Sequence, residues 1–272
     1  MTDTTTVLAE LERYCDAVPR VGGARAEEFG PLTLFVQEGT GWPYYARPAL
    51  GGPAGTAADV RRVRARQREL GLRETFEWLD GTAPWLRAAA EAAGLEVHAY
   101  PLMVLEPSAA PLPAHPRTRL LTPDDPLLRA AVTVPELAFA DPGTRVGGAG
   151  PVELAEAVAD PEARTRRERV AEMVASGRTV VAATARDGVV LCSGQYNPVG
   201  DVGEVVGVGT LPSARRQGLA VAVTAALVAR ARALGARTVF LSASDEDVAR
   251  VYARVGFRRV GTASALVAQP PG

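Results

Sequence analysis

The sequence predicts an α/β fold, a mixed α+β sheet with helices packed against it, arranged as two halves. Three observations carry this prediction: strand and helix patterns alternate in the C-terminal half, a similar alternation occurs in the N-terminal half, and a proline-rich stretch separates them. The chain of 272 residues is long enough for two ordinary domains. Hydrophobic residues make up 47% of it, which allows a sizeable core.

The C-terminal half reads as the order β-β-β-α-β-α-β, which is typical of a mixed sheet with packed helices. Its strands are β-branched apolar runs bounded by turn residues, and we expect them at 179–184, 189–195, 204–210, 238–242 and 257–267. Asp187-Gly188 is a hairpin signal between the first two. Helices are expected over 215–234 and 245–255, each followed by a glycine in the usual C-terminal position.

Four prolines within 107–119 indicate a stiff linker between a domain at 1–106 and one at 120–272. The first domain repeats the order of the second, with helices expected at 60–70 and 83–93 and strands at 75–78 and 95–105. We interpret this echo as a degenerate internal repeat. Two independent α/β segments of similar composition are the alternative.

Composition excludes several function classes. A net charge of −1 argues against a general nucleic-acid binder, which needs a basic face. No run approaches the roughly 20 apolar residues of a membrane span, and the first residues lack a signal-peptide pattern. We therefore expect a cytoplasmic protein with neither a nucleic-acid nor a membrane partner.

No residue of the chain is lysine, so all 30 basic residues are arginine. This excludes Schiff-base chemistry and the lysine of a P-loop. Cys15 and Cys192 lie far apart without metal-ligand spacing, so no metal site is expected. Cys192 lies in an apolar run and is expected in the core.

The strongest local signal is the segment 212–220, PSARRQGLA, between a strand and a helix. The first amides of a helix lack intrahelical acceptors and carry positive partial charge, so a polyphosphate can bind there. Gly218, without a Cβ, lets a phosphate approach the backbone closely. Arg215 and Arg216 add electrostatic attraction. The lack of a following GK[ST] favours a pyrophosphate carrier over a hydrolysed nucleotide.

This segment resembles the acetyl-CoA motif of the GNAT (GCN5-related) N-acetyltransferases, R/Q-x-x-G-x-G/A, at Arg215, Gly218 and Ala220. Downstream, VARVYARVGF at 248–257 resembles the A-x-x-x-Y-x-x-x-G-F segment of the same family. The resemblance covers about a third of the chain, 179–267. It implies a GNAT acyl-CoA N-acyltransferase fold in the C-terminal half. By their position alone, residues 120–177 would then form the first strand and the substrate-side helices of that fold.

The resemblance implies acetyl-CoA as co-substrate. Its pantetheine arm would pair with the strand backbone of Val208, Gly209 and Thr210. The pyrophosphate would bind at the loop and helix start, formed by Arg215, Arg216, Gln217, Gly218, Leu219 and Ala220. Asp245 stands where the family commonly has asparagine, and Ser244 is expected to replace that contact.

The implied mechanism is direct attack of an amine on the thioester in a ternary complex. Tyr252 matches the family tyrosine that protonates the leaving thiolate. Glu204 stands where histone-type members place a general base. In a regular strand it would share one face with Val206, Val208 and Thr210. A core-packing role for Tyr252 and a solvated acid at Glu204 are the alternatives.

The resemblance leaves the acceptor open as a small-molecule or peptide amine. Five acids could gather near the site and favour a cationic amine, namely Asp201, Glu204, Asp245, Glu246 and Asp247. The N-terminal half is expected to bind no CoA, because Ala90 stands in the place of Tyr252 and 51–57 lacks arginine. Edge-strand pairing, common in similar proteins, would allow a homodimer.

Two other functions fit parts of the sequence. A CoA-binding regulatory or interaction protein without catalysis would use the same loop. A dinucleotide-binding oxidoreductase would use Gly207-Val208-Gly209, but Pro212 stands where its third glycine is required and lacks an N–H group.

Overall fold

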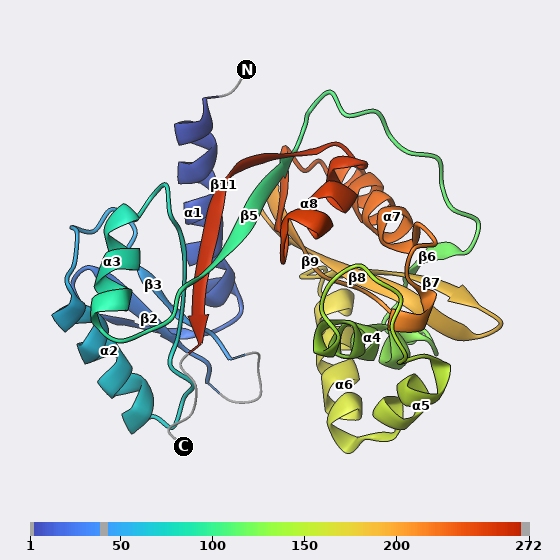
Figure 1. Ribbon diagram of the computed structural model, residues 1–272, viewed down its shortest axis with the longest axis horizontal. Helices are drawn as coiled ribbons and strands as arrows, with labels where there is room; N and C mark the ends of the chain where they lie inside the picture. The colour runs from blue at the N-terminus through green and yellow to red at the C-terminus, as the bar shows by residue number, and fades with distance from the viewer. Residues whose placement is uncertain (1–2, 39–42, 268–272) are drawn as a thin grey trace. The chain divides into compact units, whose positions relative to one another are not determined.

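A computed structural model describes residues 3–38 and 43–267 (Figure 1). The chain forms two compact units: Met1–Leu102 together with Val260–Gly272, and Met103–Arg259. Strands β5 (His98–Leu105) and β11 (Phe257–Val267) each contribute residues to both units. We describe each unit by itself.

The first unit contains a sheet with the strand order β1-β2-β3-β4-β11. Its other strands are β1 (Arg25–Glu28), β2 (Leu32–Val36), β3 (Ala46–Pro48) and β4 (Thr75–Leu79). Neighbouring strands are antiparallel except for β3 and β4, which are parallel. The helices of the unit are α1 (Thr4–Val21), α2 (Ala57–Glu69) and α3 (Pro84–Ala92).

The core of this unit lies between the sheet and helices α2 and α3. Strand β2, LTLFV, is buried at every position. Leu34 and Phe76 of the sheet share one cluster with Val60 of α2 and Leu86 of α3. Burying such side chains contributes roughly 1.5–3 kcal/mol each, so this cluster holds the two helices on the sheet.

Helix α1 is attached to the same sheet by a buried ion pair. Arg47 of β3 is 1% exposed, and its Nη2 donates to Oε1 of Glu12 at 2.6 Å. The hydroxyl of Thr82 donates to the second oxygen of Glu12 at 2.7 Å. Removing one partner of such a pair costs about 3–5 kcal/mol, because the other charge stays buried.

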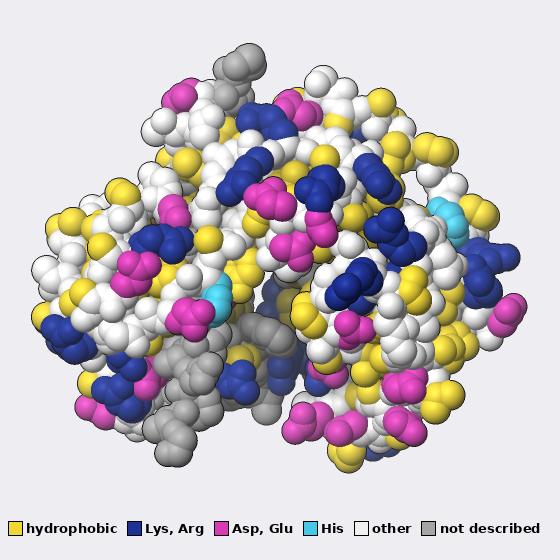
Figure 2. Space-filling model, in the orientation of Figure 1, with side chains coloured by type: hydrophobic (Ala, Val, Ile, Leu, Met, Phe, Trp, Pro, Cys, Tyr) yellow, Lys and Arg dark blue, Asp and Glu magenta, His cyan; other side chains and the backbone are white. Residues whose placement is uncertain are grey.

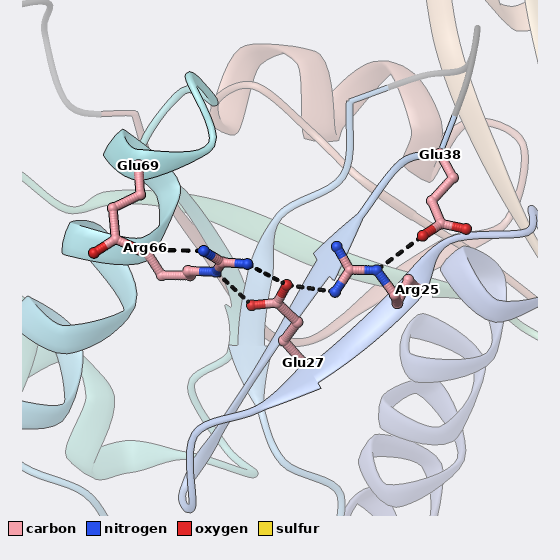
Figure 3. A network of polar contacts seen from close by, with 5 residues as sticks. All are labelled: Arg25, Glu27, Glu38, Arg66 and Glu69. Carbon is pink, nitrogen blue, oxygen red and sulfur yellow. Dashed lines mark hydrogen bonds and ion pairs between the residues drawn. The ribbon is translucent and has the colours of Figure 1, made fainter.

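Charged side chains of both signs are interspersed on the visible face in Figure 2. One network of them, drawn in Figure 3, connects β1 to α2. Glu27 accepts from Arg66 Nε at 2.8 Å and also from Arg25. Arg25 donates in turn to Glu38 at 2.8 Å, and Arg66 to Glu69 at 3.2 Å. The hydrogen bond from Arg66 is the largest effect and, together with that from Arg25, lowers the pKa of Glu27 to about 2, although burial by itself would raise it.

The second unit contains strands in the order β5-β10-β9-β8-β7-β6. Their bounds are β6 (Thr118–Leu121), β7 (Val180–Arg186), β8 (Val189–Val199), β9 (Val202–Thr210) and β10 (Thr238–Ser242). The pairs from β6 to β9 are antiparallel, and β9 pairs in parallel with β10. Its α-helices are α4 (Leu128–Ala140), α5 (Pro151–Ala159), α6 (Pro161–Ala175), α7 (Leu219–Ala233) and α8 (Glu246–Ala253).

Helices α4 and α7 cover opposite faces of this sheet, as Figure 1 shows. Ser193 of β8 donates its hydroxyl to the Ala131 carbonyl of α4 at 2.6 Å. A Cβ on the next residue, Gly194, would lie 3.2 Å from Val223 of α7. Consecutive strand residues point to opposite faces, so the two helices lie on different sides. The core cluster of the unit includes side chains from both helices.

The predicted elements of the C-terminal half are present, with differences at several ends; β8, for example, extends beyond the predicted 195 to Val199. Asp187 and Gly188 form the hairpin turn with φ of 53° and 80°, which matches a type I′ turn. Helix α7 begins at Leu219, four residues after the predicted start at 215. Residues 215–218 form an irregular loop instead, in which Arg216 and Gly218 have φ of 66° and 76°.

The domain limits 1–106, 107–119 and 120–272 stay a prediction. The two compact units divide the chain after Leu102 and return Val260–Gly272 to the first unit. Strand β11 does so by pairing with β4, with Ala263 opposite Leu79 and Leu266 opposite Phe76. Within the predicted linker, 107–117 form no helix or strand, and β6 begins at Thr118.

We expect Glu27→Gln to destabilise the protein at pH 7 by up to about 1 kcal/mol. The folded pKa of Glu27 is lowered, so its contribution is present above about pH 4.5 and is lost as pH falls toward 2. Urea unfolding of both proteins at pH 7 and at pH 3 measures this. A stability difference that grows toward pH 3 would contradict the network's role.

Candidate functional site

The separation of β9 from β10 opens the candidate site. Their parallel pairing covers Val202–Glu204 on β9 and Thr238–Phe240 on β10. Both strands continue beyond it, β9 to Thr210 and β10 to Ser242. Among the described residues, no β10 residue pairs with β9 after Glu204. One side of β9 therefore offers backbone groups without a strand neighbour along its second half.

A β-bulge in β9 lies at this separation. On the β8 side, Ser193 lies opposite Gly209 and Gln195 opposite Val206, so β9 has one residue more than β8 over this stretch. Gly207 lies within it with φ of 60°, a conformation that glycine adopts without a steric penalty. A bulge bends its strand and increases the local twist. This accounts for the departure of β9 from β10.

The bulge also changes which side chains share a face. Val206 lies opposite Gln195, and Gly209 lies opposite Ser193. Both of these β8 residues point to the face that α4 covers. Glu204 shares that face with Val206, whereas Thr210 points to the α7 face. The prediction that Glu204, Val206, Val208 and Thr210 share one face was therefore wrong, because the extra residue at Gly207 reverses the alternation.

The loop after β9 ends in a concentration of unpaired backbone amides. The first intrahelical bond of α7 runs from the Ala222 N–H to the Gly218 carbonyl at 3.1 Å. The amides of Leu219, Ala220 and Val221 therefore have no acceptor within the helix. Residues Arg216 to Gly218 before them are exposed. Left-handed residues followed by a helix start form a positively polarised concavity suited to an anion.

The side chain of Arg215 points away from this concavity. It is 8% exposed, and its guanidinium donates to the carbonyls of Ala138 and Arg145, both at 3.0 Å, and to that of Asp141. Arg215 thus attaches the loop to the end of α4. Gln217 accepts from Arg186 at 3.1 Å on the surface.

Tyr252 lies on α8 with 7% of its surface exposed. Its ring meets Phe257 edge-on, with 6.3 Å between centroids. Burial raises the pKa of Tyr252 far above its usual value, and the neighbouring thiol of Cys192 raises it further. The Tyr252 hydroxyl makes no hydrogen bond to any residue in the described ranges.

Cys192 lies beside Tyr252 and is fully buried, as the sequence predicted for a core residue. Thr210 donates its hydroxyl to Cys192 Sγ at 3.2 Å. Burial raises the pKa of the Cys192 thiol to about 12, so it stays protonated. Thr210, Cys192 and Tyr252 form a small cluster beside the end of β9. Nothing in the sequence marks Cys192 as a neighbour of the site, because its contacts come from distant segments.

Asp245 and Ser244 lie before α8. The carboxylate of Asp245 accepts from the Val248 N–H at 2.8 Å and caps the helix. The hydroxyl of Ser244 lies 3.3 Å from the other Asp245 oxygen. Asp245 therefore serves as the N-cap of α8. The cofactor contact expected of Ser244 stays a prediction.

The acids predicted to attract a cationic acceptor have arginine partners in three cases. Asp201 pairs with Arg237 at 2.8 Å. Asp247 pairs with Arg250, and Glu246 with Arg259. The positive partners offset much of the negative field that the five carboxylates would otherwise produce.

Two further observations concern metal ligands and membrane-spanning helices. No group of three or more histidine, cysteine or acidic side chains is arranged to hold a metal ion in this part of the chain. None of the helices within 3–38 and 43–267 combines the length and apolarity needed to cross a membrane.

Residues 153–257 match the model of the acetyltransferase (GNAT) family. This segment contains the separated strands, the loop before α7 and Tyr252. No curated protein sequence matches the chain.

Three solved structures share the fold over most of the chain. A GCN5-related N-acetyltransferase from Kribbella flavida is 20% identical, with a TM-score of 0.70 over 98% of this chain and 96% of its own. A functionally unknown conserved protein from Staphylococcus epidermidis is 14% identical, with a TM-score of 0.59 over 92% and 96%. A tandem GNAT protein from the clavulanic acid biosynthesis pathway is 16% identical, with a TM-score of 0.52 over 89% and 79%.

At these sequence identities the structural likeness establishes the fold alone. The family model adds the family to which residues 153–257 match. The mixed sheet with its separated strands agrees with both. Residues 153–257 are therefore an acetyltransferase domain of the GNAT family, within a fold that a GCN5-related N-acetyltransferase shares across nearly the whole chain.

Proposed function

We propose that the protein transfers an acetyl group from acetyl-CoA to the primary amine of a small molecule or peptide. One observation carries this proposal: the unpaired side of β9 leads directly into the amide-rich start of α7. An extended thioester arm with a diphosphate at its far end matches both features. Val208 to Thr210 would pair with the arm, and the amides from Arg216 to Ala220 would bind the diphosphate.

The reaction needs one proton to leave the amine and one to reach the sulfur. The amine nitrogen forms a bond to the acetyl carbon while the carbon–sulfur bond breaks and its electron pair goes to sulfur. A base takes the proton lost by nitrogen, and an acid gives a proton to the thiolate. The products are an acetamide and a thiol, so the step needs neither an oxidant nor a metal.

Tyr252 is the acid in this proposal. Its raised pKa keeps the phenol protonated at neutral pH, as an acid must be before transfer. Its hydroxyl has no hydrogen-bond partner among the described residues, which leaves it available to a thiolate. Position and protonation state both support this role over that of a packing aromatic alone.

Glu204 is the proposed base. It lies where the pairing of β9 with β10 ends, on the sheet face that α4 covers. Thr210, Cys192 and Tyr252 mark the other face. An amine arriving from the α4 face would then meet the base on one side of the thioester, with the acid on the other. A water held by Glu204 would serve equally as the proton acceptor.

For the N-terminal unit we propose descent from a duplicated GNAT-like half that has no CoA site. Its helix–strand–helix order, α2-β4-α3, repeats the order α7-β10-α8 of the second unit. The glycines that follow the helices, Gly71 and Gly94, have positive φ, as Gly235 and Gly256 do. Ala90 occupies the place of Tyr252 and is fully buried in the core cluster of the unit. An alanine there has no hydroxyl group to donate a proton to a thiolate.

Gln217→Glu tests the diphosphate site by charge alone. The side chain is exposed, and a carboxylate can still accept from Arg186. We expect acetyl-CoA to bind roughly fivefold more weakly, about 1 kcal/mol, because the added charge repels phosphate at the helix start. Calorimetric titration measures the affinity. Gln37→Glu in the first unit adds the same charge elsewhere and should leave it unchanged. Equal weakening in both variants, or no binding to the parent protein, would reject the site.

Tyr252→Phe separates an enzyme from a CoA-binding regulator. Loss of the phenolic proton should lower kcat on the order of a hundredfold, while the dissociation constant of acetyl-CoA stays within about twofold. Thiol release measured over a panel of amines gives kcat, and calorimetry gives the affinity. Because the pKa of Tyr252 is raised, the parent enzyme should show no loss of activity between pH 7 and 9. Full turnover in the variant would remove Tyr252 from the mechanism.

Glu204→Gln tests the base. If the carboxylate takes the proton, kcat should fall by on the order of a hundredfold at pH 7 and recover in part at high pH, where the amine is already neutral. The pH dependence of thiol release from pH 6 to 9.5 measures this. A decrease below about threefold at every pH would assign deprotonation to solvent.

A further inference from the structure

The connection between α4 and α5, residues 141–150, is joined to the loop that precedes α7. The Gly147 N–H donates to the Pro212 carbonyl at 3.0 Å, and the Ser213 N–H donates to the Ala149 carbonyl at 3.0 Å. The contact is close: a Cβ on Gly147 would lie 2.9 Å from Pro212 Cβ, and one on Gly150 would lie 2.8 Å from Ser213 Oγ. The two segments therefore form one paired backbone structure.

Arg215 adds a side-chain attachment to this pairing. Nη1 donates to the Arg145 carbonyl and Nη2 to the carbonyls of Ala138 and Asp141. The Asp141 carboxylate lies 3.6 Å from Nη1. The guanidinium is a planar fork that reaches acceptors in several directions at once, which a lysine ammonium on a flexible stem does not reproduce. The last carbonyls of a helix favour a cation.

The attached segment borders the proposed acceptor side. Helix α4 covers the sheet face on which Glu204 lies, and residues 141–150 continue from the end of α4. The next residue along the chain from Arg215 is Arg216, which is strained at φ of 66° and begins the amide-rich concavity. Arg215 thus links the two segments directly: its side chain contacts the connection at 141–150, and its backbone continues into the diphosphate loop.

We propose that Arg215 is a positioning residue that couples the 141–150 connection to the diphosphate loop, so that binding of acetyl-CoA orders the acceptor side. The coupling rests on the proposed function. A ligand that fixes the backbone at 216–218 also fixes Arg215, and through its three carbonyl contacts fixes the connection. Thermodynamic linkage makes the effect reciprocal: a closed connection strengthens binding of acetyl-CoA.

Tryptic cleavage after Arg145 reports directly on the connection. The Arg145 side chain is exposed while its carbonyl is bound by Arg215, so cleavage of the Arg145–Val146 bond requires the connection to open. Mass spectrometry follows this fragment among the other arginine sites. We expect cleavage after Arg145 to be roughly tenfold faster in Arg215→Lys than in the parent. Saturating acetyl-CoA should slow this cleavage more than about fivefold in the parent and should not slow it in Arg215→Lys.

Two variants complete the design. Gly147→Ala keeps the Arg215 side chain, but the added Cβ would collide with the Asp141 carboxylate and lie 2.9 Å from Pro212 Cβ, so it disrupts the connection itself and should also cleave faster and lose the protection by acetyl-CoA. Arg178→Lys, at an exposed arginine in the same unit, should behave as the parent. Circular dichroism melting confirms that each variant is folded before digestion.

The outcomes separate the two proposals. Equal cleavage rates after Arg145 in the parent, Arg215→Lys and Gly147→Ala would overturn the attachment. Calorimetric binding of acetyl-CoA to the parent without slower cleavage would overturn the coupling and leave the proposed function intact. Absence of calorimetric binding to the parent would overturn the proposed function, and the digestion without ligand would still decide the role of Arg215.

Discussion

The candidate site depends on one extra residue in strand β9. The bulge at Gly207 bends β9 away from β10 after Glu204, and it also places Thr210 on the face opposite Glu204. A strand without the bulge would remain paired with β10, and its backbone groups would be used within the sheet. Glycine permits the left-handed conformation at low cost, so a local backbone choice decides whether the sheet can accept an extended ligand.

Regular elements were predictable because their signals are local. Apolar runs, the Asp187-Gly188 turn and the glycine after each helix identified most elements of the C-terminal half. The loop between β9 and α7 was predictable, although not the late start of α7, since nothing in the sequence marks Arg216 as a left-handed residue. The bulge was missed for a related reason: Gly207 lies in a run that alternates like an ordinary strand.

Features that depend on distant partners were not predictable. Helix α1 buries Glu10, Glu12 and Asp16, acidic side chains of a type that is mostly exposed in proteins. Its attachment requires Arg47, 35 residues away. Arg215 illustrates the same limit within the site. Its place in the motif suggested a phosphate contact, whereas its partners are carbonyls about 70 residues earlier, and an arginine carries no mark of which acceptor it will meet.

The shared strand β11 has a consequence for synthesis of the chain. The second unit is contiguous, Met103–Arg259, while the first needs Val260–Val267 to pair with β4. During synthesis residues 3–102 emerge before the second unit, yet their sheet lacks β11 until residues 260–267 have been made. The first unit is thus completed only after the second, and termination near residue 259 would leave β4 with an open edge prone to intermolecular pairing.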